Sequence, residues 1–274
     1  MGTSGSFAGS GGKDAIDLRD NIAEWLDMTN DSEEQQDGES PDDNLGSEDL
    51  DRPSELPEID LTPLLRLLYR APGQSGSSDG PGRGGGGISS SSGRSSGGVT
   101  RSLGRISNAA GRAGRLAHAY STGNREVLAE AGLSYDELRA LGDPVSIGFK
   151  IVEATFDSQN DSTIAANEER AIISAVVEWI LQSPDNNVPT PEDIVRKTIE
   201  TTIAETALTE VASTAHIKEA DPRKRNSLER QVRIAAAAYA EKASLTSTGA
   251  TEQEISRAIE KGFRDIAEIF GVIP

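Results

Sequence analysis

A stretch of 28 residues, 71–98, divides this chain into two parts. Eleven of these residues are Gly and nine are Ser, and Gly84–Gly87 is an unbroken run of four. Such side chains bury too little apolar surface to offset the entropy lost on ordering, so we expect a flexible linker. The glycine run lacks the following Lys-Ser/Thr of a phosphate-binding loop. The fold must therefore be sought separately on the two sides of the linker.

The sequence after the linker has a helical pattern throughout. Several segments begin with a capping residue, a proline at the first helical position, or both. These starts are Ser134 with Glu137, Thr190-Pro191 with Asp193, Thr251 with Glu254, Asp143-Pro144 and Asp221-Pro222. The alternation of β-branched residues that is typical of strands is absent. We expect an all-α domain, a helical bundle, over residues 99–274, with helices at about 100–121, 124–131, 134–141, 144–158, 163–182, 191–214, 222–244 and 251–270.

The sequence before the linker is expected to be largely disordered, with short helical islands. Residues 1–13 form a Gly/Ser-rich tail, and residues 14–70 are acidic, with eighteen Asp or Glu between positions 14 and 60. Islands at 15–28 and 61–70 each carry an apolar helical face. Each island either packs on the folded domain or lies in a groove of a partner. Their candidate partner-binding residues are Trp25, Leu64, Leu65 and Leu68.

The stability of the protein is expected to reside after the linker. The capped helices and the long apolar stripes all lie there, so residues 99–274 should fold alone. Deleting residues 1–98 is then expected to leave thermal stability nearly unchanged. The leucines of 61–70 could change this outcome, because fully burying one such side chain contributes roughly 1.5–3 kcal/mol.

The composition excludes most catalytic chemistries. There is no Cys and only two His, which removes disulfides, thiolate ligands and a cysteine nucleophile and leaves little for a zinc site. No Ser/His/Asp set has a suggestive spacing, so we expect a non-enzymatic protein with no catalytic residue, metal or cofactor. No apolar run approaches the roughly 18 residues of a membrane span, and a secretory signal pattern is absent. A cytoplasmic location without membrane contact is the expectation.

The segment from 101 to 120 is the main local anomaly in a chain of net charge −18. Its four arginines are candidate anion-binding residues: Arg101, Arg105, Arg112 and Arg115. They alternate with small residues, among them Gly104, Gly111 and Gly114, which allow another backbone to come near. Such a helix could bind phosphates, as in a nucleic-acid or nucleotide-sensing module, or the acidic tail, or it could be a solvated lead-in helix. Acids outnumber bases 45 to 27, which makes nucleic acid an unexpected partner.

The first residues, Met1-Gly2-Thr3-Ser4-Gly5-Ser6, suggest a second site. A small second residue allows removal of the initiator Met, so we expect a free α-amine on Gly2. A tail without core-forming residues that presents this amine could be recognised or modified by another protein, with Gly2, Thr3 and Ser4 as the site. A frayed terminus or a cloning remnant is the alternative. N-myristoylation is a rival modification, because Gly2 with Ser6 fits the acceptor pattern.

The layout of the whole chain resembles the B component of the Qat anti-phage defence system. The resemblance rests on the Met1-Gly2-Thr3-Ser4 start, the Gly/Ser tether, the lead-in from Ser102-Leu103-Gly104-Arg105, and the all-α C-terminal domain. The stretch Arg115–Ile147 is also similar to the helical start of that family. One departure is that Trp25 stands in an acidic setting, where a proline-rich stretch with Trp would be expected.

The resemblance implies a set of partners and a role. The partners are an ATPase, an enzyme similar to the 7-cyano-7-deazaguanine synthases (QueC-like), and a TatD-like nuclease. The synthase-like enzyme would act on the tail and attach a deazaguanine group to the Gly2 amine. The chain would then serve as a substrate and scaffold.

Overall fold

A computed structural model describes residues 12–34, 58–69, 100–156, 164–184, 186–218, 222–245 and 248–274. Within these ranges the chain is all-α, which confirms the predicted fold class, and no strand occurs in them. The helices of the described part are α1 (Lys13–Glu34), α2 (Thr62–Tyr69), α3 (Thr100–Ser121), α4 (Arg125–Glu130), α5 (Tyr135–Ala140), α6 (Pro144–Phe156), α7 (Ile164–Gln182), α8 (Pro191–Lys218), α9 (Pro222–Glu241) and α10 (Glu252–Ile269).

Side-chain caps begin several of these helices where the sequence predicts them. Thr251 accepts a hydrogen bond from the Glu254 backbone N–H, and the Glu254 side chain reciprocates, which completes a capping box before α10. At the start of α5, the Ser134 hydroxyl accepts a hydrogen bond from the Glu137 backbone N–H. Before α6, Asp143 Oδ1 accepts from Ser146 N at 2.9 Å. Such caps satisfy amide groups that have no partner inside the helix.

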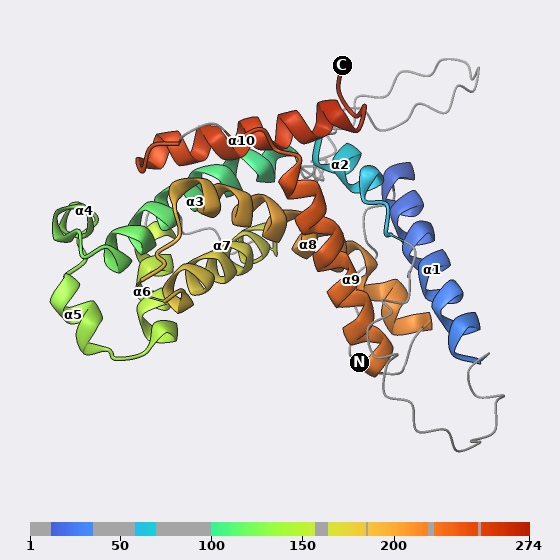
Figure 1. The fold of residues 1–274 in the computed structure, drawn as a ribbon, viewed down its shortest axis with the longest axis horizontal. Coiled ribbons are helices and arrows are strands. Elements are labelled where there is room, and N and C mark those ends of the chain that lie inside the picture. The colour runs from blue at the N-terminus through green and yellow to red at the C-terminus, as the bar shows by residue number, and fades with distance from the viewer. Residues whose placement is uncertain are drawn as a thin grey trace, which may run out of the picture.

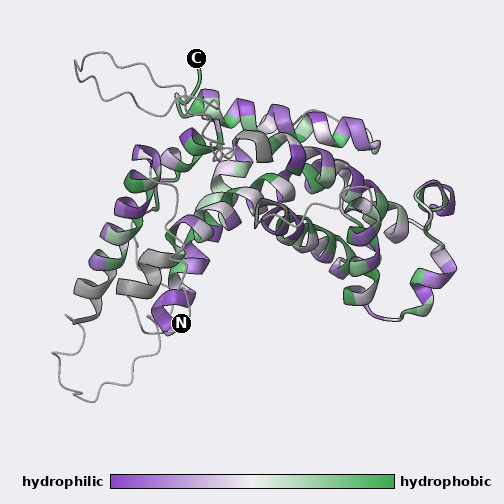
Figure 2. Cartoon of the chain, turned by 180° about the vertical axis from the view of Figure 1, so that it is seen from behind, coloured by the Kyte–Doolittle hydropathy of each residue, from purple (hydrophilic) through white to green (hydrophobic). Residues whose placement is uncertain are grey.

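The longest helix, α8, connects the two halves of the molecule (Figure 1). It contacts α9, α1 and α2 on one side and α7, α10 and α3 on the other. α3, α6, α7 and α10 pack together beyond it, and the short α4 and α5 extend from their far end. Figure 2 shows apolar and polar residues alternating along α1 and α10, so that each helix has an apolar side to bury.

The close crossing of α3 and α10 depends on small residues. A side chain on Gly111 would collide with the backbone oxygen of Glu252, and one on Gly114 would meet Ile194 of α8. At the same crossing, Ser256 Oγ donates to Asn108 Oδ1 at 2.8 Å. Gly104, two turns earlier in the same helix, has nothing within 4 Å of the position a side chain would take. Two of the three glycines of α3 therefore allow neighbouring helices to come near.

The two N-terminal islands belong to the same hydrophobic core as the rest of the protein. α1 buries Leu18 and Ile22 fully, and α2 buries Leu64, Leu65 and Leu68 fully. α1 packs on α2 and α8, and α2 also packs on α3, α8 and α10. The structure thus selects packing on this chain's own helices for both islands. The structure differs from the expectation that the core begins at residue 99, because α1 packs on α8, and α2 on α3, α8 and α10, all of which lie beyond the linker.

A polar clamp fixes the start of α2 to α9. The Tyr239 hydroxyl donates to Asp60 Oδ1 at 2.9 Å and accepts from the Leu61 backbone N–H at 3.1 Å. Asp60 Oδ1 also accepts from Thr62 N at 2.8 Å. The Tyr239 ring stacks on Phe270, with centroids 4.2 Å apart. Burial raises the pKa of Tyr239 to about 12, so its hydroxyl keeps its proton at neutral pH.

Candidate functional site

The arginines of α3 do not share one environment. Arg105 pairs with Glu169 of α7 at 3.1 Å, and that carboxylate is only 2% exposed. Arg115 pairs with Glu130 of α4 at 2.6 Å. Both guanidinium groups therefore neutralise acids of this chain, and Arg105 compensates a buried charge that would be costly alone. Arg101 lies in the first turn of α3, and its side chain is outside the described part.

The remaining arginine, Arg112, lies in a cleft of about 740 Å³. We call this space, which is bounded by α3, α5, α6 and the turn that joins α4 to α5, the α3–α6 cleft. Its lining combines leucines with charged groups, including Leu133, Leu138, Leu141 and Lys150. A volume of this size and a mixed lining are typical of binding sites in proteins. The structure thus points to one arginine of the predicted set as a candidate binding residue.

The walls of this cleft are held by polar and aromatic contacts. Arg125 makes a bidentate ion pair with Asp136, with both N–O distances at 2.8 Å, which joins the start of α4 to α5. Its guanidinium also lies over the Tyr135 ring, and that ring packs against Tyr120 of α3. Glu130 adds the ion pair to α3 described above. These contacts form a preorganised cleft, which lowers the entropic cost of binding.

The charges around the cleft are unevenly compensated. Lys150 donates to Glu153 at 2.8 Å on the same helix, so these two lining charges neutralise each other. Within the described part of the chain no carboxylate pairs with Arg112, which is half-buried. Glu137 is exposed to solvent, where its charge is hydrated. The cleft therefore offers one half-buried cation to a ligand.

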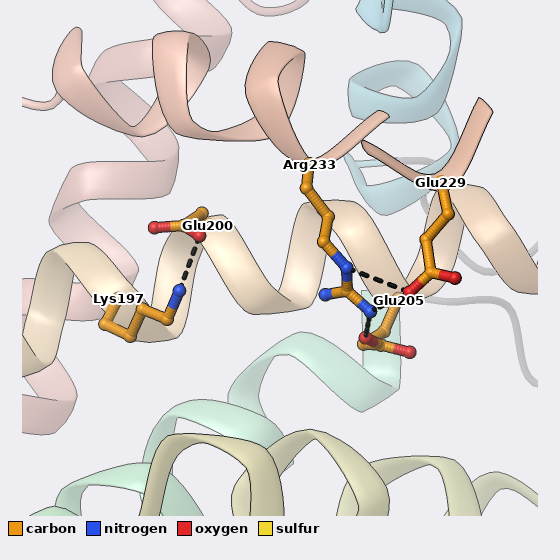
Figure 3. A network of polar contacts seen from close by, with 5 residues as sticks. All are labelled: Lys197, Glu200, Glu205, Glu229 and Arg233. Carbon is orange, nitrogen blue, oxygen red and sulfur yellow. Dashed lines mark hydrogen bonds and ion pairs between the residues drawn. The ribbon is translucent and has the colours of Figure 1, made fainter. Parts of the chain in front are cut away.

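Arg233 of α9 is neutralised by two carboxylates of this chain. Arg233 donates to Glu229 of its own helix at 2.9 Å and to Glu205 of α8 at 3.0 Å, as Figure 3 shows. Lys197 and Glu200 form a further pair along α8, at 2.6 Å. A groove of about 270 Å³ lies beside Arg233, between α8 and α9. This groove has less than half the volume of the cleft at Arg112, which makes it the weaker candidate.

The other predicted site residues fall into two groups. Gly2, Thr3 and Ser4 lie outside the described residues. Trp25, Leu64, Leu65 and Leu68 are each at most 3% exposed. These four side chains pack inside the chain itself, so their predicted availability to a partner does not agree with the structure. The helical spacing of these apolar residues predicted that they would be buried. The structure shows that the helices that carry them pack on each other and on α3, α8 and α10 of the same chain.

The described part of the chain contains neither a metal-ligand cluster nor a membrane-spanning helix. There, no group of three or more His, Asp or Glu side chains is arranged to hold a metal ion. None of the described helices combines the length and the apolar character needed to cross a bilayer.

Burial lowers the pKa of His118, so this half-buried residue of α3 is neutral at pH 7.

Comparison with known proteins leaves the site to be interpreted from its own geometry. No family model, no curated protein and no solved structure matches this chain.

Sequence reasoning predicted the elements of the α3–α6 cleft but missed the cleft itself. Helices were expected at 124–131 and 134–141, the second from its cap at Ser134. Gly132 and Gly142, both with a φ of 75°, turn the chain after α4 and after α5. In the sequence, a glycine shortly after each of these six-residue helices was the signal that could have predicted a tight turn. The direction in which these turns bring α5 back toward α3 depends on contacts far apart in the sequence.

Proposed function

We propose that this chain is a non-enzymatic component of a bacterial anti-phage defence system, acting in the cytoplasm as a scaffold and substrate. Its amino-terminal tail, with Gly2, Thr3 and Ser4, is presented to a QueC-like partner enzyme for recognition or covalent modification. An ATPase and a TatD-like nuclease complete the system that the resemblance to the Qat B component implies. The modification that fits this partner is attachment of a deazaguanine group to the Gly2 amine.

The anchoring of α1 is the observation that supports this proposal most directly. α1 begins at Lys13, immediately after the Gly/Ser-rich tail, and buries Ala15, Leu18 and Ile22 fully. The tail is thus attached to a packed helical core at a defined point. Eleven residues, 2–12, span at most about 40 Å when fully extended. A partner that takes up Gly2 must therefore place its active site within that distance of the start of α1.

The chemistry of an α-amine favours it as the modified group. An α-amino group has a pKa of about 7.7–8.0, against about 10.4 for a lysine side chain. At neutral pH a much larger fraction of the α-amine is unprotonated and able to attack a carboxyl carbon that the partner enzyme has activated, which forms an amide and releases the activating group and a proton. A glycine adds little steric hindrance around this nucleophile. The tail therefore offers a partner a more reactive amine than any of the lysines of the chain.

Intact-mass measurement of the chain co-expressed with its neighbouring genes tests the proposal. We expect loss of Met1 and an added group that peptide mapping places on Gly2. Replacement Gly2→Leu should retain Met1 and abolish both the modification and phage protection, whereas Lys13→Arg, which alters a nearby amine, should preserve both. The proposal is wrong if the mass is unmodified and a Gly2→Ala variant protects fully. A mass increase of a myristoyl group would assign the tail to acylation instead.

A further inference from the structure

The α3–α6 cleft continues into an exposed apolar stripe on α6. Val145 and Phe149 are 69% and 66% exposed, and Leu141, which lines the cleft, is 43% exposed. Val145, Phe149 and Glu153 are spaced four residues apart, so they lie along one side of the helix. Glu153 lines the cleft, and the stripe therefore leads directly into it.

The stripe lies on a part of α6 that the core does not use. Ile147 and Ile151 are buried, and Gly148 lies near Val177 and Leu181 of α7, so that side of α6 packs on α7. Val145 and Phe149 are on the other side of the helix. A large aromatic side chain exposed next to a leucine-lined cleft is typical of a surface that another protein covers.

The charge of Arg112 indicates which chemical group of a ligand the cleft would bind. A half-buried guanidinium without a carboxylate partner is best satisfied by an acidic group, and the fork of an arginine matches the two oxygens of a carboxylate. Its helix neighbours Arg105 and Arg115 already have such partners within the chain. Among the arginines of α3 whose side chains the structure describes, Arg112 is the one with no carboxylate partner in the described residues.

We propose that the α3–α6 cleft, together with the exposed stripe of Val145 and Phe149, binds a peptide segment of a partner protein. The segment carries apolar side chains that pack on the leucines and on Phe149, and an Asp or Glu that pairs with Arg112. The preformed walls of the cleft favour recognition of a short segment over a broad, flat surface. This site is separate from the tail and does not depend on modification of Gly2.

Selection of a displayed library of random peptides against the full chain tests the site. We expect the selected peptides to share apolar residues and one acid. Arg112→Gln should weaken their binding by at least about tenfold. Changing the peptide's acid to its amide should weaken binding by about the same factor, and the two changes together should weaken it no further. Phe149→Ser should weaken binding through lost packing. The exposed residues Ile234 and Arg230 on α9 provide matched controls, and Ile234→Ser and Arg230→Gln should bind as the unaltered chain does.

Four results would overturn the proposal. The first is selection that yields no peptide dependent on Arg112 and Phe149, and the second is a shared peptide pattern without an acid. The third is self-association of the chain in sedimentation that Phe149→Ser abolishes, because the cleft would then belong to a second copy. The fourth is an oligonucleotide that binds the chain through Arg112 when no peptide does. Circular dichroism of each variant shows that the helical fold is retained, which is expected for substitutions at exposed and half-buried positions.

Discussion

At the scale of single residues, the small side chains of α3 set how closely α10 can approach. A methyl group at Gly111 would collide with the Glu252 backbone, whereas one at Gly104 meets nothing within 4 Å. We expect Gly111→Ala to lower the free energy of unfolding by about 1–3 kcal/mol through overpacking. Gly104→Ala should raise it by up to about 1 kcal/mol, because alanine is the better helix former. Urea denaturation of both variants checks this, and equal effects would contradict the observed crossing.

The carboxylate of Asp60 gives a second prediction at this scale. Burial acts to raise its pKa, but the hydrogen bonds from Thr62 and Tyr239 outweigh burial and hold the pKa below its ordinary value. A lowered pKa in the folded state stabilises the protein above the unfolded pKa of about 3.9 and loses this contribution as the pH falls through the folded value. The difference in unfolding free energy between the unaltered chain and Asp60→Asn should be constant from about pH 5 to 7 and shrink below about pH 4. A difference that does not change with pH would exclude this role.

At the scale of elements, local sequence determines the helices better than it determines their neighbours. Caps and prolines located α5, α6, α8, α9 and α10 within a few residues, because those signals act within one turn. The helix predicted at 15–28 runs on to Glu34. The contact between Leu61 and Tyr239 joins residues 178 positions apart, and no local pattern specifies such a pairing. The cleft at Arg112 escaped prediction for the same reason.

The second helix provides a direct test at the element scale. Leu65 is fully buried between helices, and its neighbour Arg66 is exposed. Leu65→Ala should cost about 2–5 kcal/mol of stability through lost burial and the cavity left behind. Arg66→Ala, on the same helix, should change stability by less than about 0.5 kcal/mol. Chemical denaturation distinguishes the two, and a silent Leu65→Ala would indicate that α2 is a partner-binding motif after all.

At the scale of the whole molecule, the Gly/Ser-rich segment connects parts of one core. Sequence composition correctly separates segments that can bury apolar surface from those that cannot. Composition cannot show that the apolar segments before residue 71 and after residue 98 pack on each other, because the sequence of a flexible linker does not specify which helix faces come into contact. α8 is the element they share, since it contacts both α1 and α2 as well as α7 and α10.

Two truncations separate the tail from the core. Apart from Phe7 and Ala8, residues 2–11 are Gly, Ser and Thr, which can bury little apolar surface, so deleting residues 2–11 should leave the melting temperature within about 2 °C of the full chain. Deleting residues 2–69 removes α1 and α2 and exposes the surfaces of α3, α8 and α10 that they cover. Each fully buried leucine lost contributes roughly 1.5–3 kcal/mol, and 1 kcal/mol corresponds to about 2–4 °C in a chain of this size. The larger deletion should therefore lower the melting temperature by more than about 10 °C, as measured by calorimetry, and an unchanged value would place the core boundary back at residue 99.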